Sequence, residues 1–180
     1  MSDGRPVLVV VGGLPATGKS TIADHLARLV GAPYLRVDRI EQAIVAYSLL
    51  EHPIGAAGYA VAYALASEQL KVGLDVIVEC VNPIALTRDS WVATATDANA
   101  AILEVEVICS DPDEHRRRVL TRATDVAGLV KPTWEDLLHR EYEPWSRPHL
   151  VLDSVDTAPD QAAQHIAANI VAVRQERSSA

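Results

Sequence analysis

Runs of apolar residues alternate with segments of helical periodicity along the whole chain. Five short apolar runs predict strands near residues 7–11, 34–38, 75–79, 102–109 and 149–153. Between them, apolar side chains recur every three or four positions, as Ile22, Leu26 and Leu29 do. This periodicity predicts helices at about 22–30, 39–50, 56–72, 82–94, 112–123 and 133–143, with a last helix from about 157. Strands that alternate with helices predict an α/β fold, with a parallel sheet covered on both faces.

The first apolar run leads directly into a glycine-rich loop. Residues 13–20 fit the pattern G-x-x-x-x-G-K-[ST], the phosphate-binding P-loop, and they lie between a predicted strand and a predicted helix. Gly13 and Gly18 let backbone N–H groups point at phosphate oxygens, Lys19 brings a positive charge, and the Ser20 hydroxyl is a ligand for Mg²⁺. The predicted ATP-binding residues are Gly13, Leu14, Pro15, Ala16, Thr17, Gly18, Lys19, Ser20 and Thr21.

Two further predicted strands end in an acidic residue, Asp38 and Glu79. Ligands of parallel sheets bind beyond the carboxyl ends of the strands, so both acids should lie beside the P-loop. Either carboxylate is a candidate base toward a substrate hydroxyl, and Glu79 is also a candidate partner of Ser20 in holding Mg²⁺. Asp38-x-x-Glu41 also fits a capping box, so a structural role for Asp38 stays open.

The helix predicted after the fourth strand is rich in arginine. Arg118 and Arg122 are four residues apart and therefore share one face. Directed at a triphosphate, they would neutralise charge in the transition state, and Arg118 would also contact the nucleotide. The alternative is a solvated basic face paired with Asp113 and Glu114. Residues 124–132 lack periodicity and predict a lid that excludes water.

A pocket for the phosphate acceptor is expected between residues 39–72 and the loop after Glu79. Its candidate substrate-binding residues are Asp38, Arg39, Glu79, Tyr59 and Tyr63. The two tyrosines are one helical turn apart, and a pair at this spacing is also typical of a hydrophobic core.

Length and composition limit the remaining classes. The 180 residues, 49% apolar and 22% charged, predict a single globular domain over residues 1–180. The net charge of −8 argues against general nucleic-acid binding and against an anionic membrane surface. The sequence has neither a signal-peptide pattern nor an apolar run of membrane-spanning length, so a cytoplasmic protein is expected. The oligomeric state is left open.

These motifs together resemble the small P-loop kinases. The residues that carry the resemblance are the loop 13–21, Asp38, the strand 76–79, the arginine-rich helix 116–122 and the strand ending in Asp153. The pattern is most similar to the zeta-toxin and chloramphenicol-phosphotransferase-like group, AAA-type ATP-binding proteins. The resemblance implies a sheet in the order 2-3-1-4-5, a base role for Asp38, and lid-side arginines at 118 and 122. Glu41 stands where some members have arginine, which favours a neutral or cationic acceptor.

The expected function is therefore ATP-dependent transfer of the γ-phosphate to a hydroxyl of a small molecule, such as a metabolite, an antibiotic or a nucleoside-like compound. Two alternatives remain. A nucleoside or nucleotide kinase would need arginines for an acceptor phosphate, with Arg39 and Arg88 as candidates outside the lid. A nucleotide-dependent binding or switch protein would hydrolyse ATP only slowly.

Overall fold

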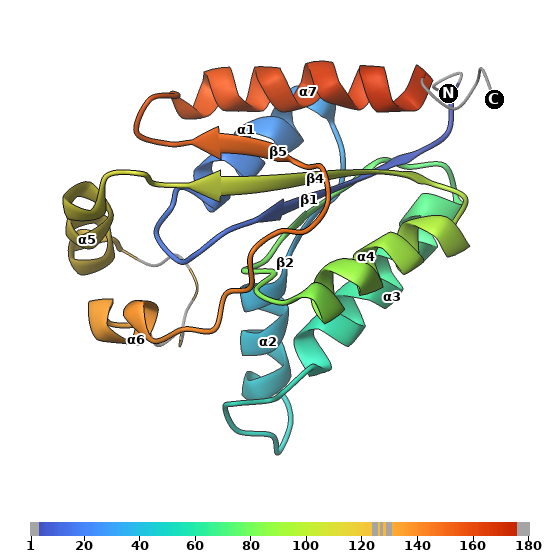
Figure 1. Cartoon of the computed structure of the whole chain (residues 1–180). Coiled ribbons are helices and arrows are strands. Elements are labelled where there is room, and N and C mark those ends of the chain that lie inside the picture. Colours follow the sequence, from blue (N-terminus) through green and yellow to red (C-terminus); the bar gives the residue numbers. More distant parts are fainter. Residues whose placement is uncertain (1–3, 124–125, 127, 129–130, 176–180) are drawn as a thin grey trace.

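A five-stranded parallel sheet forms the centre of the structure (Figure 1), a computed structural model that describes residues 4–123, 126, 128 and 131–175. The strands lie in the order β2-β3-β1-β4-β5, which confirms the predicted sheet. In chain order they are β1 (Val7–Gly12), β2 (Tyr34–Arg36), β3 (Val76–Glu79), β4 (Ala101–Ile108) and β5 (Leu150–Asp153).

Helices cover both faces of the sheet. In chain order they are α1 (Lys19–Val30), α2 (Val37–Ala46), α3 (Ala57–Lys71), α4 (Ala85–Asp97), α5 (Pro112–Thr121), α6 (Trp134–Leu138) and α7 (Pro159–Gln175). The helices α1 and α7 pack together on one face, and α3 and α4 pack together on the other, while α5 and α6 lie beyond the carboxyl end of β4 (Figure 1). None of the helices described here combines the length and the apolar character needed to cross a bilayer.

The central strand β1 explains the continuous apolar run near the start of the sequence. Its alternate side chains point to opposite faces. Val7, Val9 and Val11 belong to the core beneath α1 and α7, whereas Leu8 and Val10 belong to the core beneath α3 and α4. A strand buried on both faces has no polar alternation. The P-loop follows directly from the carboxyl end of this buried strand.

The second strand is shorter than predicted, and this changes the setting of Asp38. The strand expected at 34–38 ends at Arg36, and α2 begins at Val37. Val37 is buried in the core on the first turn of α2, so tertiary packing overrides its preference for a strand. Asp38 therefore lies in the first turn of α2 and not at a strand end. The N-cap of α2 is Arg36, with no side-chain cap, so the expected capping box of Asp38 and Glu41 does not form.

Predicted helix ends also differ from the observed ones, and the helix expected over 39–50 ends at Ala46. The helix expected at Asn82 begins at Ala85, since Asn82 has a left-handed backbone with φ of 54°. The helix expected over 133–143 ends at Leu138, because the following segment bonds to the loop after β3, with Glu143 N donating to Pro83 O at 2.8 Å. Of the expected lid, residues 124, 125, 127, 129 and 130 lie outside the described part of the chain.

Candidate nucleotide and acceptor site

The P-loop connects β1 to α1 and is held by close backbone contacts. Gly13 has φ of 138°, and a Cβ atom there would lie 2.3 Å from the Val107 carbonyl oxygen, so only glycine fits. The Gly13 N–H donates to Val81 O at 3.1 Å. Within the loop, Thr17 Oγ1 donates to Leu14 O at 3.0 Å. Gly18, with φ of 98°, is the N-cap of α1, so the positive end of that helix faces the loop.

Lys19 is buried at the start of α1. Its Nζ donates to the Leu14 carbonyl oxygen at 2.9 Å. Burial lowers the pKa of this ammonium group, while the nearby carboxylates of Glu79 and Asp38 raise it. The P-loop lysine thus lies close to both of the acidic residues that the sequence placed at this edge of the sheet.

Glu79 is buried at the end of β3, and both of its carboxylate oxygens are occupied. Ser20 Oγ donates to Oε1 at 2.5 Å. The Tyr34 hydroxyl donates to Oε2, and Arg36 Nε lies 3.0 Å from the same oxygen. The roles of Tyr34 and Arg36 were not predicted. Their spacing of two along β2 is the only local signal, since it places both side chains on one face of the strand.

Ser20 and Glu79 suit a magnesium ion bound with a nucleotide. Their hydroxyl and carboxylate oxygens are the hard donors that Mg²⁺ prefers. No group of three or more His, Cys, Asp or Glu residues in the described part of the chain could hold a metal ion. Mg²⁺ is usually bound by one or two protein side chains together with phosphates and water.

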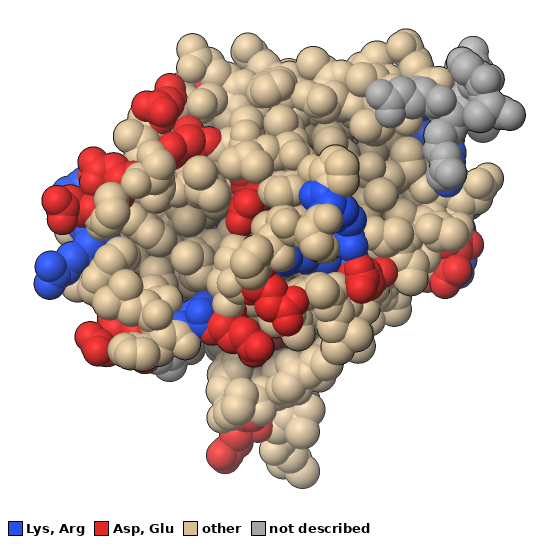
Figure 2. All heavy atoms as spheres, in the orientation of Figure 1, with Lys and Arg blue, Asp and Glu red and all other residues tan. Residues whose placement is uncertain are grey.

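A cavity of about 1650 Å³ opens beside the P-loop. Most of the predicted site residues line it, namely Pro15, Ala16, Gly18, Lys19, Ser20, Thr21, Asp38, Arg39, Tyr59, Glu79, Arg118 and Arg122. The elements that bring them together are the P-loop, the end of β3, α2, α3 and the end of α5. On the face seen in Figure 2, acidic and basic side chains are interspersed, and no broad basic surface extends across it.

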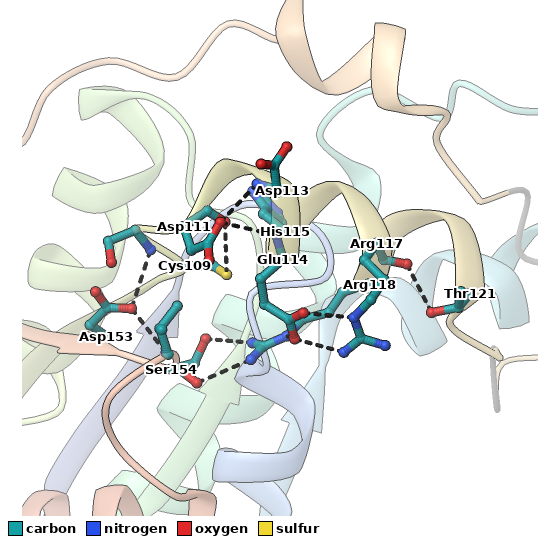
Figure 3. Close-up of polar contacts among 12 residues, drawn as sticks. Cys109, Asp111, Asp113, Glu114, His115, Arg117, Arg118, Thr121, Asp153 and Ser154 are labelled. Atoms are coloured by element: carbon teal, nitrogen blue, oxygen red, sulfur yellow. Dashed lines mark hydrogen bonds and ion pairs between the residues drawn. The ribbon is translucent and has the colours of Figure 1, made fainter.

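The two predicted arginines, Arg118 in α5 and Arg122 at its C-cap, both line this cavity. Arg118 Nη1 and Nη2 donate to Ser154 Oγ at 2.7 Å and to Ser154 O at 3.1 Å, which ties α5 to the loop after β5 (Figure 3). Glu114 accepts from both Arg117 and Arg118. Burial lowers the pKa of Arg122, against the opposing charges of Asp38 and Glu79. The alternative of pairing with Glu114 holds for exposed Arg117 and also for Arg118, which pairs with Glu114 as well as with Ser154.

His115 adds a contact that sequence reasoning missed. It is buried on α5, and its Nε2 lies 2.8 Å from the Pro15 carbonyl oxygen of the P-loop. Its ring meets Trp134 of α6 edge-on, at 5.5 Å between centroids. Asp111 is the N-cap of α5 and accepts from Asp113 N and Glu114 N. The position of α5 over the P-loop is therefore fixed by its capping residue, His115 and Arg118.

Residues 8–143 match the family described as AAA domain. The chain belongs to this family. A search of curated proteins finds no match. The resemblance to AAA-type P-loop proteins is confirmed.

Solved structures share the fold of this AAA domain. The APS kinase CysC of Mycobacterium tuberculosis, in complex with AMPPNP and APS, is 21% identical with a TM-score of 0.67, over 94% of this chain and 99% of that one. A gluconokinase of Sinorhizobium meliloti is 17% identical with a TM-score of 0.67, over 98% of each chain. Kti12 of Chaetomium thermophilum, in complex with ADP-AlF3, is 22% identical with a TM-score of 0.60, over 93% of this chain and 98% of that one.

The two tyrosines of α3 in this AAA domain have different surroundings. Tyr59 lines the cavity, and its hydroxyl oxygen accepts from Asn82 N at 3.0 Å. Tyr63 is not among the residues that line the cavity. Its ring packs against Trp91 at 4.3 Å, and its hydroxyl donates to Thr87 O at 3.2 Å. The structure thus places Tyr63 in the core between α3 and α4.

Arg88, a candidate for binding an acceptor phosphate, is also buried away from the cavity. Its guanidinium donates to the backbone carbonyls of Asn82, Pro83, Glu143 and Pro144. It also stacks over the Trp145 ring at 4.3 Å. Arg88 therefore joins the loop after β3 to the segment after α6.

Glu41 lies one turn after Asp38 on α2 and lines the cavity. Its side chain packs against Gly58, where a Cβ atom would lie 2.2 Å from Glu41 Cγ. Burial raises the pKa of the carboxyl to about 7, the Asp38 charge adds to this effect, and Arg140 opposes it. Ionised Glu41 therefore destabilises the folded state, and this cost develops as the pH rises from 4.5 to about 7.

Glu41→Gln is accordingly expected to stabilise the protein above pH 7. We expect a gain of about 1 to 2 kcal/mol at pH 8, after allowance for solvent screening, that falls toward zero near pH 4.5. Denaturant unfolding across this pH range measures the effect. Glu51→Gln, which alters an exposed carboxylate, is the control. A stability difference between Glu41→Gln and the parent protein that stays constant with pH would contradict the raised pKa.

Proposed function

We propose that this AAA domain is an ATP-dependent phosphotransferase that moves the γ-phosphate to a hydroxyl of a small molecule. The observation that carries the proposal is that Asp38 lines the same cavity as Lys19, Ser20 and Arg122. The Asp38 carboxylate, which can accept a proton, thus lies beside the P-loop, the positive charges of Lys19 and Arg122, and the Ser20 hydroxyl, a candidate ligand for Mg²⁺. Phosphoryl transfer needs this combination of positioning and charge neutralisation.

The donor half of the site consists of the P-loop and the arginines of α5. Backbone N–H groups of residues 16–20 would hold the β- and γ-phosphates, while Lys19, Arg118 and Arg122 would neutralise the charge that develops during transfer. Mg²⁺ held by Ser20 and Glu79 would neutralise further charge on the phosphates. Arg118, bonded to Ser154 beyond β5, would contact the nucleotide on the side away from the acceptor.

Asp38 fits the role of base better than Glu79 does. The Glu79 carboxylate is buried and accepts hydrogen bonds on both oxygens. The Asp38 carboxylate accepts no hydrogen bond from the residues that the structure describes, and it is only partly buried at the cavity wall. We infer that Asp38 takes the proton of the acceptor hydroxyl and that Glu79 serves Ser20 and the cation.

Arg39, Tyr59 and Glu41 would form the acceptor half of the cavity. The Glu41 carboxyl group favours a neutral or cationic acceptor. Solved neighbours with this fold include an APS kinase and a gluconokinase, which supports a small-molecule kinase but not this charge preference, since APS and gluconate are anions. A nucleotide kinase is the second candidate, because Arg39 and Arg140 both line the cavity and could meet an acceptor phosphate. We infer that the protein acts in the cytoplasm, because ATP is its proposed donor.

An acceptor screen tests this function. ADP production from Mg·ATP is measured over a panel of sugars, polyols, amino alcohols, hydroxylated antibiotics, nucleosides and nucleoside monophosphates. We expect at least one neutral or cationic hydroxyl compound to stimulate ADP production above the rate with water. Stimulation by monophosphates alone would favour the nucleotide kinase. A slow rate that no compound changes would favour a switch protein.

A further inference from the structure

The carboxylate of Glu79 is fixed from β2, on the side opposite the P-loop. Arg36 is the register partner of Glu79 in the parallel pair β2–β3. Tyr34 precedes Arg36 by two residues on the same strand, so both side chains reach the same neighbour. The Tyr34 hydroxyl donates to Glu79 Oε2, and Arg36 Nε lies 3.0 Å from that oxygen. Only Oε1 is left to face Ser20.

The direction of the Ser20 hydroxyl follows from this arrangement. Ser20 Oγ donates its proton to Glu79 Oε1 at 2.5 Å. A hydroxyl has one proton and two lone pairs, so a proton held by Glu79 leaves the lone pairs of Oγ for a cation. If the Glu79 carboxylate could rotate, this orientation would be lost.

We propose that Tyr34 and Arg36 are positioning residues that hold Glu79 against Ser20 and thereby set the affinity of the nucleotide site for its divalent cation. The inference rests on the proposed function for the identity of the cation and the nucleotide. It concerns nucleotide binding, however, and does not depend on which acceptor is used. Partners of this kind around metal ligands commonly change metal affinity by about 10- to 100-fold.

Tyr34→Phe removes the hydroxyl that holds Glu79 Oε2 and keeps the ring. Calorimetric titration of ADP, at a series of Mg²⁺ concentrations and in EDTA, separates metal-dependent from metal-free binding. We expect Tyr34→Phe to raise the Mg²⁺ concentration required for tight binding by about tenfold. Binding of ADP in EDTA should change by less than about twofold, because the P-loop is untouched.

The chain offers a matched control and a second variant. Tyr142 is another half-buried tyrosine whose hydroxyl donates to a carboxylate of the sheet, Glu106, at 2.8 Å, and Tyr142→Phe should leave the Mg²⁺ requirement unchanged. In a Glu79→Gln background, Tyr34→Phe should add nothing further, because both changes act through one carboxylate. Arg36→Lys, which keeps the charge but not the guanidinium geometry, should shift the requirement in the same direction.

Three results would each overturn the positioning role. They are a Mg²⁺ requirement within twofold of the parent protein, an equal loss of ADP binding with and without Mg²⁺, and a Tyr34→Phe effect that persists in Glu79→Gln. Each of these results would leave the proposed phosphotransferase standing. A parent protein whose ADP binding does not respond to Mg²⁺ would instead overturn the proposed function together with this inference.

Discussion

Asp38→Asn is expected to lower phosphotransfer to the acceptor by about 10²- to 10⁴-fold, the usual contribution of a general base. The amide keeps the size and polarity of the side chain but cannot take the proton of the acceptor hydroxyl. Asp38 neither caps α2 nor accepts a hydrogen bond from any residue that the structure describes, so the substitution should not disturb the fold. The loss should appear in kcat, with the affinity for Mg·ADP changed by less than about threefold.

The measurement is steady-state transfer to the best acceptor of the screen, together with calorimetric titration of Mg·ADP. Asp97→Asn, at the exposed end of α4, is the control and should behave as the parent protein. Robust transfer by Asp38→Asn would remove the base role. A large loss in Glu79→Gln with retained Mg²⁺ dependence would move that role to Glu79.

Lys19→Met is expected to impair both nucleotide binding and transfer. Methionine keeps much of the volume but removes the ammonium group that would meet the β- and γ-phosphates. Charge-assisted hydrogen bonds of this kind stabilise a complex by about 1.5–3 kcal/mol, so the affinity for Mg·ADP should fall about 10- to 100-fold. Transfer should fall by about 10²- to 10³-fold.

The same substitution should not destabilise the fold. Burial lowers the pKa of Lys19, which shows that the folded state disfavours its charged form. Replacing the ammonium group with an apolar side chain should therefore leave the free energy of unfolding unchanged or raise it. Thermal unfolding separates this result from a misfolded variant, and Lys71→Met, at an exposed lysine at the end of α3, is the control. Full transfer activity in Lys19→Met would contradict the assignment of the donor site.

Local patterns predicted the parts of the molecule whose causes are local. The apolar run at Val7–Gly12 forms the central strand because a strand buried on both faces needs no polar residue. The P-loop follows from its glycines and from the strand and helix that flank it. The cap of α5 follows from Asp111 and Pro112. Lys19, Ser20, Arg118 and Arg122, which such patterns singled out, line one cavity.

Contacts between distant segments decided what the sequence could not predict. The local pattern predicts that Val37 belongs to a strand. Because Val37 is buried in the core, it instead forms the first turn of α2, and Asp38 lies in the same helix. Tyr59 and Tyr63 share a helical spacing, and only the packing of Trp91 from α4 separates a cavity wall from a core residue. The link of Tyr34 to Glu79 depends on the pairing of β2 with β3, which no local pattern specifies.

Transfer of a radiolabelled γ-phosphate tests the central claim most directly. The parent protein is incubated with labelled Mg·ATP and the acceptor panel, and the products are separated from ATP and inorganic phosphate. We predict label on a hydroxyl-bearing small molecule, with the signal lost in Lys19→Met and Asp38→Asn. Label released only as inorganic phosphate, at a rate that no acceptor changes, would contradict the assignment of this AAA domain as a small-molecule phosphotransferase.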